Sequence, residues 1–132
     1  MKAGLIKTII AVCAIAAVTW GAYYLYNISN YKKVVNTIQV QSVDLNNIQN
    51  GKYSGKFDAN VISAEVEVTV DNHKIKSVDL INHKNERGKK AEAIIDTVIE
   101  KQTINVDTVS GATNSSKVIL KAIENALNNA EV

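Results

Sequence analysis

The sequence predicts a small α+β domain, a small antiparallel sheet packed with two helices, preceded by one N-terminal transmembrane helix. Three observations predict it. Residues 8–31 contain no charged side chain. Residues 64–70 alternate apolar and polar side chains, as a half-buried strand does. Two later segments, 89–101 and 118–127, carry apolar residues at the helical period. The 132-residue chain is thereby divided into three parts: a membrane anchor (1–30), a tether (31–50) and a domain (51–132).

The excess positive charge of the chain lies entirely at its N-terminus. The chain has 15 Lys and Arg residues against 13 Asp and Glu residues, and Lys2 and Lys7 have no acidic counterpart before residue 31. The remainder is therefore neutral. A neutral body without a basic stripe argues against nucleic-acid binding, which requires several cations converging on phosphates.

The N-terminal segment is long enough to cross a membrane once. About 20 helical residues span the roughly 30 Å hydrocarbon layer, and residues 8–28 would lie in the lipid bilayer. Lys2 and Lys7 favour a cytoplasmic N-terminus, and the Trp and Tyr residues at positions 20–31 fit an aromatic belt at the outer interface. We therefore expect a single-pass protein of the cell membrane with an extracytoplasmic C-terminal domain.

Two forms of processing are alternatives to a retained anchor. Residues 14–16 read Ala-Ile-Ala, like a signal-peptide cleavage site, but cleavage there would leave a short apolar region and several aromatic residues just after the cut. Residues 10–13 resemble a bacterial lipobox, but Val12 is larger than the residue that lipoboxes place before the Cys. We favour Cys13 as an apolar residue within the span. As the single Cys of the chain, it can form no intrachain disulfide.

In the body of the chain, side chains that alternate with a period of two predict three strands: residues 51–57, 64–70 and 75–81. In the first, Tyr53, Gly55 and Phe57 share one face. Residues 71–74 supply turn residues that join the other two strands in a hairpin. Residues 103–109 could add an edge strand through their apolar positions.

A segment rich in hydroxyl groups separates the last strand from the last helix. Residues 107–116 read Asp-Thr-Val-Ser-Gly-Ala-Thr-Asn-Ser-Ser, with Asn114, Ser115 or Ser116 as the expected N-cap. Free amides and the helix dipole favour an anion there, and Gly111 lets the backbone approach it. The segment could hold a phosphate. An ordinary capped turn is the alternative interpretation of the same residues.

Residues 107–113 resemble the flavinylation motif of FMN-binding domains: Asp, two variable residues, Ser or Thr, Gly, Ala, then Thr or Ser. The resemblance extends over residues 51–127. Members of that family include the C subunit of the sodium-pumping NADH:quinone reductase, the G subunit of the Rnf complex and domains used in extracellular electron transfer. The resemblance implies that Thr113 carries FMN through a phosphoester bond, installed from FAD by a magnesium-dependent flavin transferase. It also implies that the other motif residues shape the turn or are read by the transferase, namely Asp107, Ser110, Gly111 and Ala112.

The resemblance also indicates where the flavin ring would be bound. In the family, the loop after the hairpin carries a polar residue such as His83, then a Glu and a Gly-containing turn. Here Glu86, Arg87 and Gly88 would line the flavin, although Arg87-Gly88 replaces the usual Thr-Pro-Gly. Lys84 or Arg87 could stabilise a reduced anionic flavin at N1. A solvated loop is an equally open interpretation.

Two aromatic residues and one further histidine complete the set of candidates. Tyr53 and Phe57 could provide a stacking face for the ring, with core packing favoured for Phe57. His73 is expected to lie exposed in a turn. Two separated histidines without Cys or paired carboxylates predict no metal site.

Together with the apolar anchor, the resemblance implies a membrane-anchored electron carrier without catalytic residues or stand-alone catalysis. Its partners would be the flavin transferase, a membrane electron donor and an extracytoplasmic acceptor. Two alternatives stay open. One is an unflavinylated binding module on the cell surface, and the other is an accessory subunit of a larger membrane reductase complex.

Overall fold

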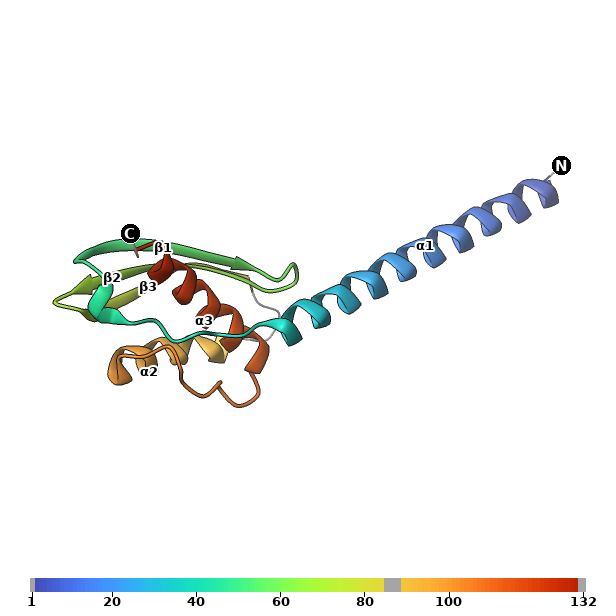
Figure 1. Ribbon diagram of the computed structural model, residues 1–132. Helices are drawn as coiled ribbons and strands as arrows, with labels where there is room; N and C mark the ends of the chain where they lie inside the picture. Colours follow the sequence, from blue (N-terminus) through green and yellow to red (C-terminus); the bar gives the residue numbers. More distant parts are fainter. Residues whose placement is uncertain (1, 85–88, 131–132) are drawn as a thin grey trace.

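The computed structural model describes residues 2–84 and 89–130. A three-stranded antiparallel sheet of order β1-β2-β3 carries helices on one face, and a long N-terminal helix projects away from this domain (Figure 1). The elements are α1 (Lys2–Thr37), η1 (Leu45–Asn47), β1 (Gly51–Asp58), β2 (Ser63–Asp71), β3 (Lys74–Lys84), η2 (Lys89–Ala93), α2 (Ile94–Lys101) and α3 (Thr113–Asn128), where η marks a short 3-10 helix. The predicted α+β class is confirmed.

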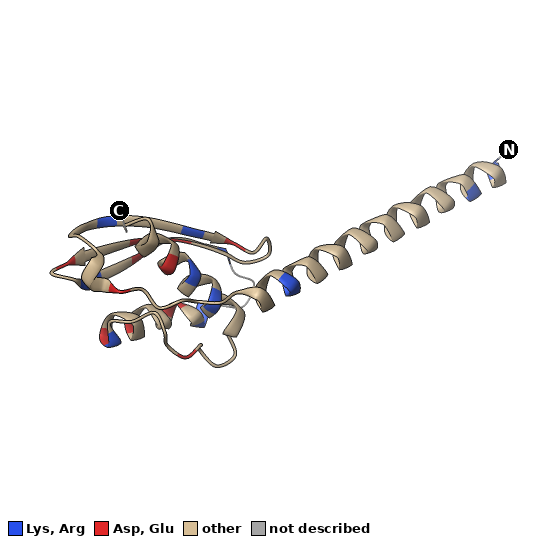
Figure 2. Cartoon of the chain, in the orientation of Figure 1, with Lys and Arg blue, Asp and Glu red and all other residues tan. Residues whose placement is uncertain are grey.

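Helix α1 is apolar and exposed over most of its length. Its large apolar side chains between Leu5 and Tyr26 are exposed, and Trp20 is 75% exposed. Figure 2 shows no charged residue along the middle of the helix. By length and composition α1 is a candidate membrane span, since a surface of this kind is suited to lipid. Its 36 residues reach about 54 Å. This length exceeds the roughly 30 Å hydrocarbon layer, so a helix that crosses it along the bilayer normal would extend beyond it.

The alternation predicted for the central strand β2 is present. Four of its side chains are at most 1% exposed: Ala64, Val66, Val68 and Val70. The polar residues between them point to the other face and are half-buried. In β1, the side of the strand that carries Tyr53, Gly55 and Phe57 faces the helices, as predicted. The sheet therefore has one apolar face, which is the face that α3 and α2 cover.

Strand β3 is longer and less regular than predicted. Its hairpin turn holds Asn72 and His73 with φ of 52° and 60°, the pair of positive angles that a type I′ turn requires. Two register shifts against β2 insert one extra residue each, at Lys76 and at Ile81. The bulges change the alternation, so that the residues opposite the buried positions of β2 are Ile75, Val78, Leu80 and His83. His83 is thereby placed on the covered face of the sheet.

Gly55 determines how closely α3 can lie against the sheet. A Cβ atom at this position would overlap the carbonyl oxygen of Ala122 and the backbone nitrogen of Ala126. The helix backbone thus passes directly over β1. Two hydrogen bonds fix its direction, from the Asn125 side chain to the Lys56 carbonyl (2.9 Å) and from Asn129 to Ser54 (3.0 Å).

Residues 31–50, for which the composition predicts a polar tether, pack against the domain. Helix α1 continues to Thr37, and the Val35 and Ile48 side chains are at most 1% exposed. The backbone N–H of Gln41 donates to the Glu124 carboxylate (3.1 Å). Lys121 donates to the Gln39 carbonyl (3.2 Å). The segment after α1 is therefore attached to α3 at Gln39 and Gln41.

The expectation of an edge strand over residues 103–109 is wrong, because the structure describes this segment and it contains no strand. The side chain of Gln102 forms two hydrogen bonds with the backbone of Ile75 in β3. It accepts from the Ile75 N–H (2.7 Å) and donates to the Ile75 carbonyl (2.8 Å). Gln102 ends α2 in the left-handed region, with φ of 53°. A side chain thus takes the place of a fourth strand at this point of the edge.

We predict that Gly55→Ala destabilises the domain by about 1–3 kcal/mol, since the atoms that meet the new methyl group belong to backbone or to a buried alanine. Pulse proteolysis of the full chain in detergent, as a function of urea concentration, measures this change. Gly21→Ala is the matched control, because a Cβ atom there meets nothing within 4 Å. Equal stability of the two variants would contradict the close approach of α3 to β1.

Candidate functional site

The hydroxyl-rich segment forms a tight turn directly before α3. The Ala112 amide donates to the Val109 carbonyl (3.0 Å), which closes a turn with Ser110 and Gly111 at its corners. Gly111 has φ of +79°. A positive φ at the third residue is the conformation of a type II turn, which favours glycine there. The turn presents Ser110 and Gly111 to solvent.

The side chain of Ser116, in the first turn of α3, stabilises the β-turn of residues 109–112 by hydrogen bonds. Its buried Oγ accepts from the Val109 amide (3.0 Å) and donates to the Ala112 carbonyl (2.7 Å). The expected cap at Asn114, Ser115 or Ser116 is wrong. The helix begins earlier, at Thr113, with Ala112 in the N-cap position and no side-chain cap. The Ser116 hydroxyl bonds to the preceding turn instead, and this holds the turn against the helix.

The first turn of α3 therefore presents uncapped amides beside an exposed hydroxyl. The first N–H groups of an α-helix have no acceptor within the helix, and no side chain caps them here. Thr113 is exposed, and the buried Oγ of Ser115 has no hydrogen-bond partner among the described residues. A phosphate group on the Thr113 oxygen would lie at the positive end of the helix dipole. This donor set fits a phosphoester.

A row of residues that are not buried, here called the open line, runs from Thr113 along α3. Between Ser115 and Leu127, three residues of the helix are not buried: Lys117, Lys121 and Asn125. They follow Thr113 at intervals of four residues, which places them on one face of a helix. Every other residue of α3 between Ser115 and Leu127 is buried against the sheet, η2 or the segment after α1.

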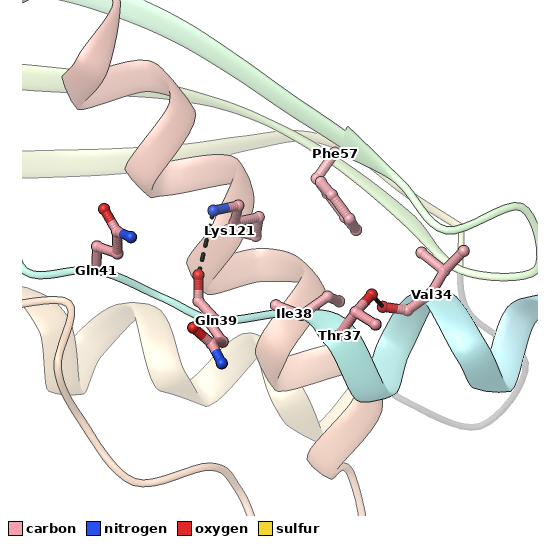
Figure 3. Close-up of a pocket in the computed structure, with 7 residues that line it drawn as sticks. All are labelled: Val34, Thr37, Ile38, Gln39, Gln41, Phe57 and Lys121. Carbon is pink, nitrogen blue, oxygen red and sulfur yellow. Dashed lines mark hydrogen bonds between the residues drawn. The ribbon is translucent and has the colours of Figure 1, made fainter.

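This line reaches a cavity of about 280 Å³ between the last turn of α1, the end of β1 and α3. Figure 3 shows its lining residues, which are Val34, Thr37, Ile38, Gln39, Gln41, Phe57 and Lys121. Val34, Ile38 and Phe57 are partly buried apolar side chains packed against the core. The lining thus combines these apolar side chains with polar residues and one cation, Lys121. Its volume approaches the lower end of the usual range for ligand sites, roughly 300–1,000 Å³.

The structure does not place all the residues that were expected around the flavin ring close to residues 107–113. Glu86, Arg87 and Gly88 lie outside the described residues. Lys84 donates from Nζ to the Asn60 carbonyl (3.0 Å), at the turn between β1 and β2. Asp107 is exposed.

The two aromatic candidates of β1 are placed differently from each other. Tyr53 donates to the Gln49 carbonyl (2.8 Å) and precedes Ser54, which accepts from Asn129 beyond the C-terminal end of α3. Helix α3 has 16 residues, about 24 Å, and it separates Tyr53 from Thr113. Phe57 is half-buried and packs against the core, as expected, and it also lines the cavity.

Both histidines have defined environments. The His83 side chain is 3% exposed, and its Nδ1 lies 3.1 Å from the Glu92 carboxylate. His73, expected to lie exposed in its turn, is exposed, and its Nδ1 lies 3.1 Å from the Ile48 carbonyl and 3.2 Å from the Leu45 carbonyl. It thereby connects the hairpin turn to η1. In the described part of the chain, no group of three metal-ligating side chains comes together.

Sequence reasoning missed the cavity and its cation, Lys121. The signal for Lys121 was partly present, since Lys117 and Lys121 are four residues apart at the start of the predicted helix. No comparable signal existed for Val34 and Ile38. They precede the domain in the chain and were assigned to a tether.

Comparison with known proteins gives one family match. Residues 62–128 match the family model of the FMN-binding domain. This match covers half of the chain and includes the sheet from β2 onward, the turn at Gly111 and all of α3. A comparison with curated proteins gives no significant match.

We predict opposite outcomes for alanine at the two adjacent buried serines of α3. Ser116→Ala removes two hydrogen bonds and leaves the Val109 amide without its acceptor, at an expected cost of about 1–3 kcal/mol. Ser115→Ala removes a hydroxyl without a partner among the described residues, so its effect should be near neutral or stabilising. Hydrogen exchange at Val109 provides the local measurement and should become roughly ten- to a hundredfold faster in Ser116→Ala alone. Equal exchange in both variants would contradict the role of Ser116.

Proposed function

Because the chain belongs to the FMN-binding domain family and carries an N-terminal apolar helix, we propose that it is a membrane-anchored electron-transfer protein with FMN covalently attached to Thr113. One observation carries the attachment. The flavinylation motif at residues 107–113 forms a tight turn that ends at an exposed threonine hydroxyl, beside the uncapped amides of a 16-residue helix. An electron carrier of this kind needs no substrate pocket of its own.

The attachment reaction would use Thr113 as the nucleophile. Its Oγ attacks the phosphorus on the riboflavin side of the FAD diphosphate, a P–O bond to Thr113 forms, the phosphoanhydride bond breaks and AMP leaves. The hydroxyl proton passes to a base of a magnesium-dependent flavin transferase, which is a separate enzyme. This chain contributes an accessible hydroxyl on a turn whose corner residues are exposed.

The residues around Thr113 would then hold the phosphoester in place. Amide N–H groups at the start of α3 donate to the phosphate oxygens, and the helix dipole favours their negative charge. When bound, FMN supplies reversible acceptance and donation of electrons. A covalent link keeps the cofactor from diffusing away in a compartment where lost FMN is not replaced.

In this proposal the membrane anchor places the flavin beside an electron donor in the membrane. A donor in the membrane would reduce the flavin, and an extracytoplasmic acceptor would oxidise it. Lys2 and Lys7 before the apolar segment, and Trp and Tyr residues toward its far end, support an extracytoplasmic domain.

We predict that the chain, expressed with a flavin transferase, gives a fluorescent band on a denaturing gel under ultraviolet light, and that Thr113→Ala abolishes it. Mass spectrometry should show an addition of FMN minus one water. Thr113→Ser should retain the band, because its hydroxyl can form the same ester.

Thr108→Ala is the matched control, since it removes another hydroxyl from the same segment at a variable position of the motif. It should load as well as the unmodified chain. Absence of fluorescence in the unmodified chain, or its persistence in Thr113→Ala, would contradict the attachment. An unlabelled chain would favour the alternative of a cell-surface binding module.

We further predict that a membrane-impermeant maleimide labels the domain on intact cells. In a Cys13→Ser background, Asn128→Cys places a thiol at the exposed end of α3 and Ala3→Cys places one at the other end of α1. The former should react on intact cells, and the latter only after the membrane is opened. The reverse pattern would contradict the proposed orientation.

A further inference from the structure

The open line on α3 provides a path from Thr113 to the cavity at the end of α1. Thr113 and Lys121 are eight residues apart, about 12 Å along the helix axis, and Lys117 lies between them on the same face. An extended ribityl phosphate is of comparable length. A chain attached at Thr113 and laid along this face would therefore deliver its far end to the cavity.

The cavity suits the two ends of an isoalloxazine ring. Val34, Ile38 and Phe57 form an apolar wall that fits the dimethylbenzene end. Gln39, Gln41 and Lys121 also line the cavity, and their polar groups fit the pyrimidine end; Figure 3 shows the Lys121 ammonium directed to the Gln39 carbonyl oxygen. Phe57 adds an aromatic side chain that can contact the ring.

Lys121 is held in place by two acceptors among the described residues. Its Nζ lies 3.0 Å from a Glu124 carboxylate oxygen and donates to the Gln39 carbonyl at 3.2 Å. An ammonium group has three N–H donors, so the third is available to a ligand. The Lys121 side chain is 24% exposed, which keeps this donor accessible from the cavity.

We propose that the cavity between α1, β1 and α3 binds the isoalloxazine ring of FMN attached at Thr113, with Lys121 at its polar edge and the last turn of the membrane helix as one wall. This proposal rests on the attachment proposed above. It assigns a binding role to Val34, Ile38 and Lys121, and it places the redox-active ring against the membrane anchor itself.

The placement explains why the segment after α1 is attached to α3. A flexible tether would leave the ring between two bodies that move independently. Here the backbone N–H of Gln41 and the Lys121 ammonium both bond to the Glu124 carboxylate. These bonds fix the segment after α1, which forms one wall of the cavity, relative to α3, which forms the other. The ring would stay close to the point where α1 leaves the bilayer, within reach of a membrane-bound donor.

The test uses the full chain, loaded with FMN and purified in detergent, with two matched pairs of variants. Phe57→Leu is paired with Tyr53→Leu, an aromatic residue on the same face of β1 but at the far end of α3. Lys121→Gln is paired with Lys101→Gln, an exposed lysine at the end of α2. Gel fluorescence measures loading, iodide quenching measures exposure of the ring, and redox titration measures its midpoint potential.

We expect equal loading in all variants and several-fold weaker iodide quenching in the folded unmodified chain than after denaturation. Phe57→Leu should increase quenching in the folded state. Lys121→Gln should shift the midpoint potential to more negative values, because a cation beside N1 stabilises the reduced anion. The paired controls should change neither quantity.

Two other outcomes separate the proposals. An unmodified chain without a fluorescent band on the denaturing gel would contradict the attachment at Thr113 and, with it, the placement of the ring. Normal loading with a ring that is fully quenchable, or with a potential that is unaltered in Lys121→Gln, would contradict the placement alone.

Discussion

The close passage of α3 over β1 at Gly55 is the contact on which the rest of the domain depends. Without a Cβ atom at this position, the helix backbone at Ala122 and Ala126 can rest directly on the strand. That contact fixes where both ends of α3 lie. The N-terminal end receives the turn at Gly111 and exposes Thr113, and the C-terminal end is bonded to Ser54. A small domain of about 80 residues buries only a modest core, so each such contact carries a large share of its stability.

A second constraint connects the domain to its membrane helix. Val35 and Ile48 are buried in the same core as the sheet, and Glu124 bonds to both Gln41 and Lys121. Glu124 is nearly completely buried, and a carboxylate in that position requires partners of this kind. The domain is consequently held at the end of α1. In the electron carrier proposed above, this attachment would give a defined distance between cofactor and bilayer, in place of the range of distances that a free tether would allow.

Much of the fold was predictable because its signals are local. The alternation in β2, the turn at residues 71–74 and the apolar period of α3 depend on neighbours within a few residues. The motif around Thr113 was likewise visible in the order of its residues. The register of β3 was not, since its two bulges arise from pairing with β2 and move His83 to the covered face. The helix cap was mispredicted because Ser116 bonds to the turn before the helix, a choice that depends on how that turn packs.

The sequence by itself determined the apolar N-terminal helix, the α+β class and the hydroxyl-rich turn before α3, because hydrophobic periodicity and turn chemistry act over short stretches of chain. Only the tertiary structure decided which residues line the cavity at the end of α1. Val34, Phe57 and Lys121 are separated by many residues, and they share a cavity only after α3 crosses β1 and the end of α1 docks beside it. The physical reason is that a cavity is formed by the packing of distant elements, and no pattern within one element records it.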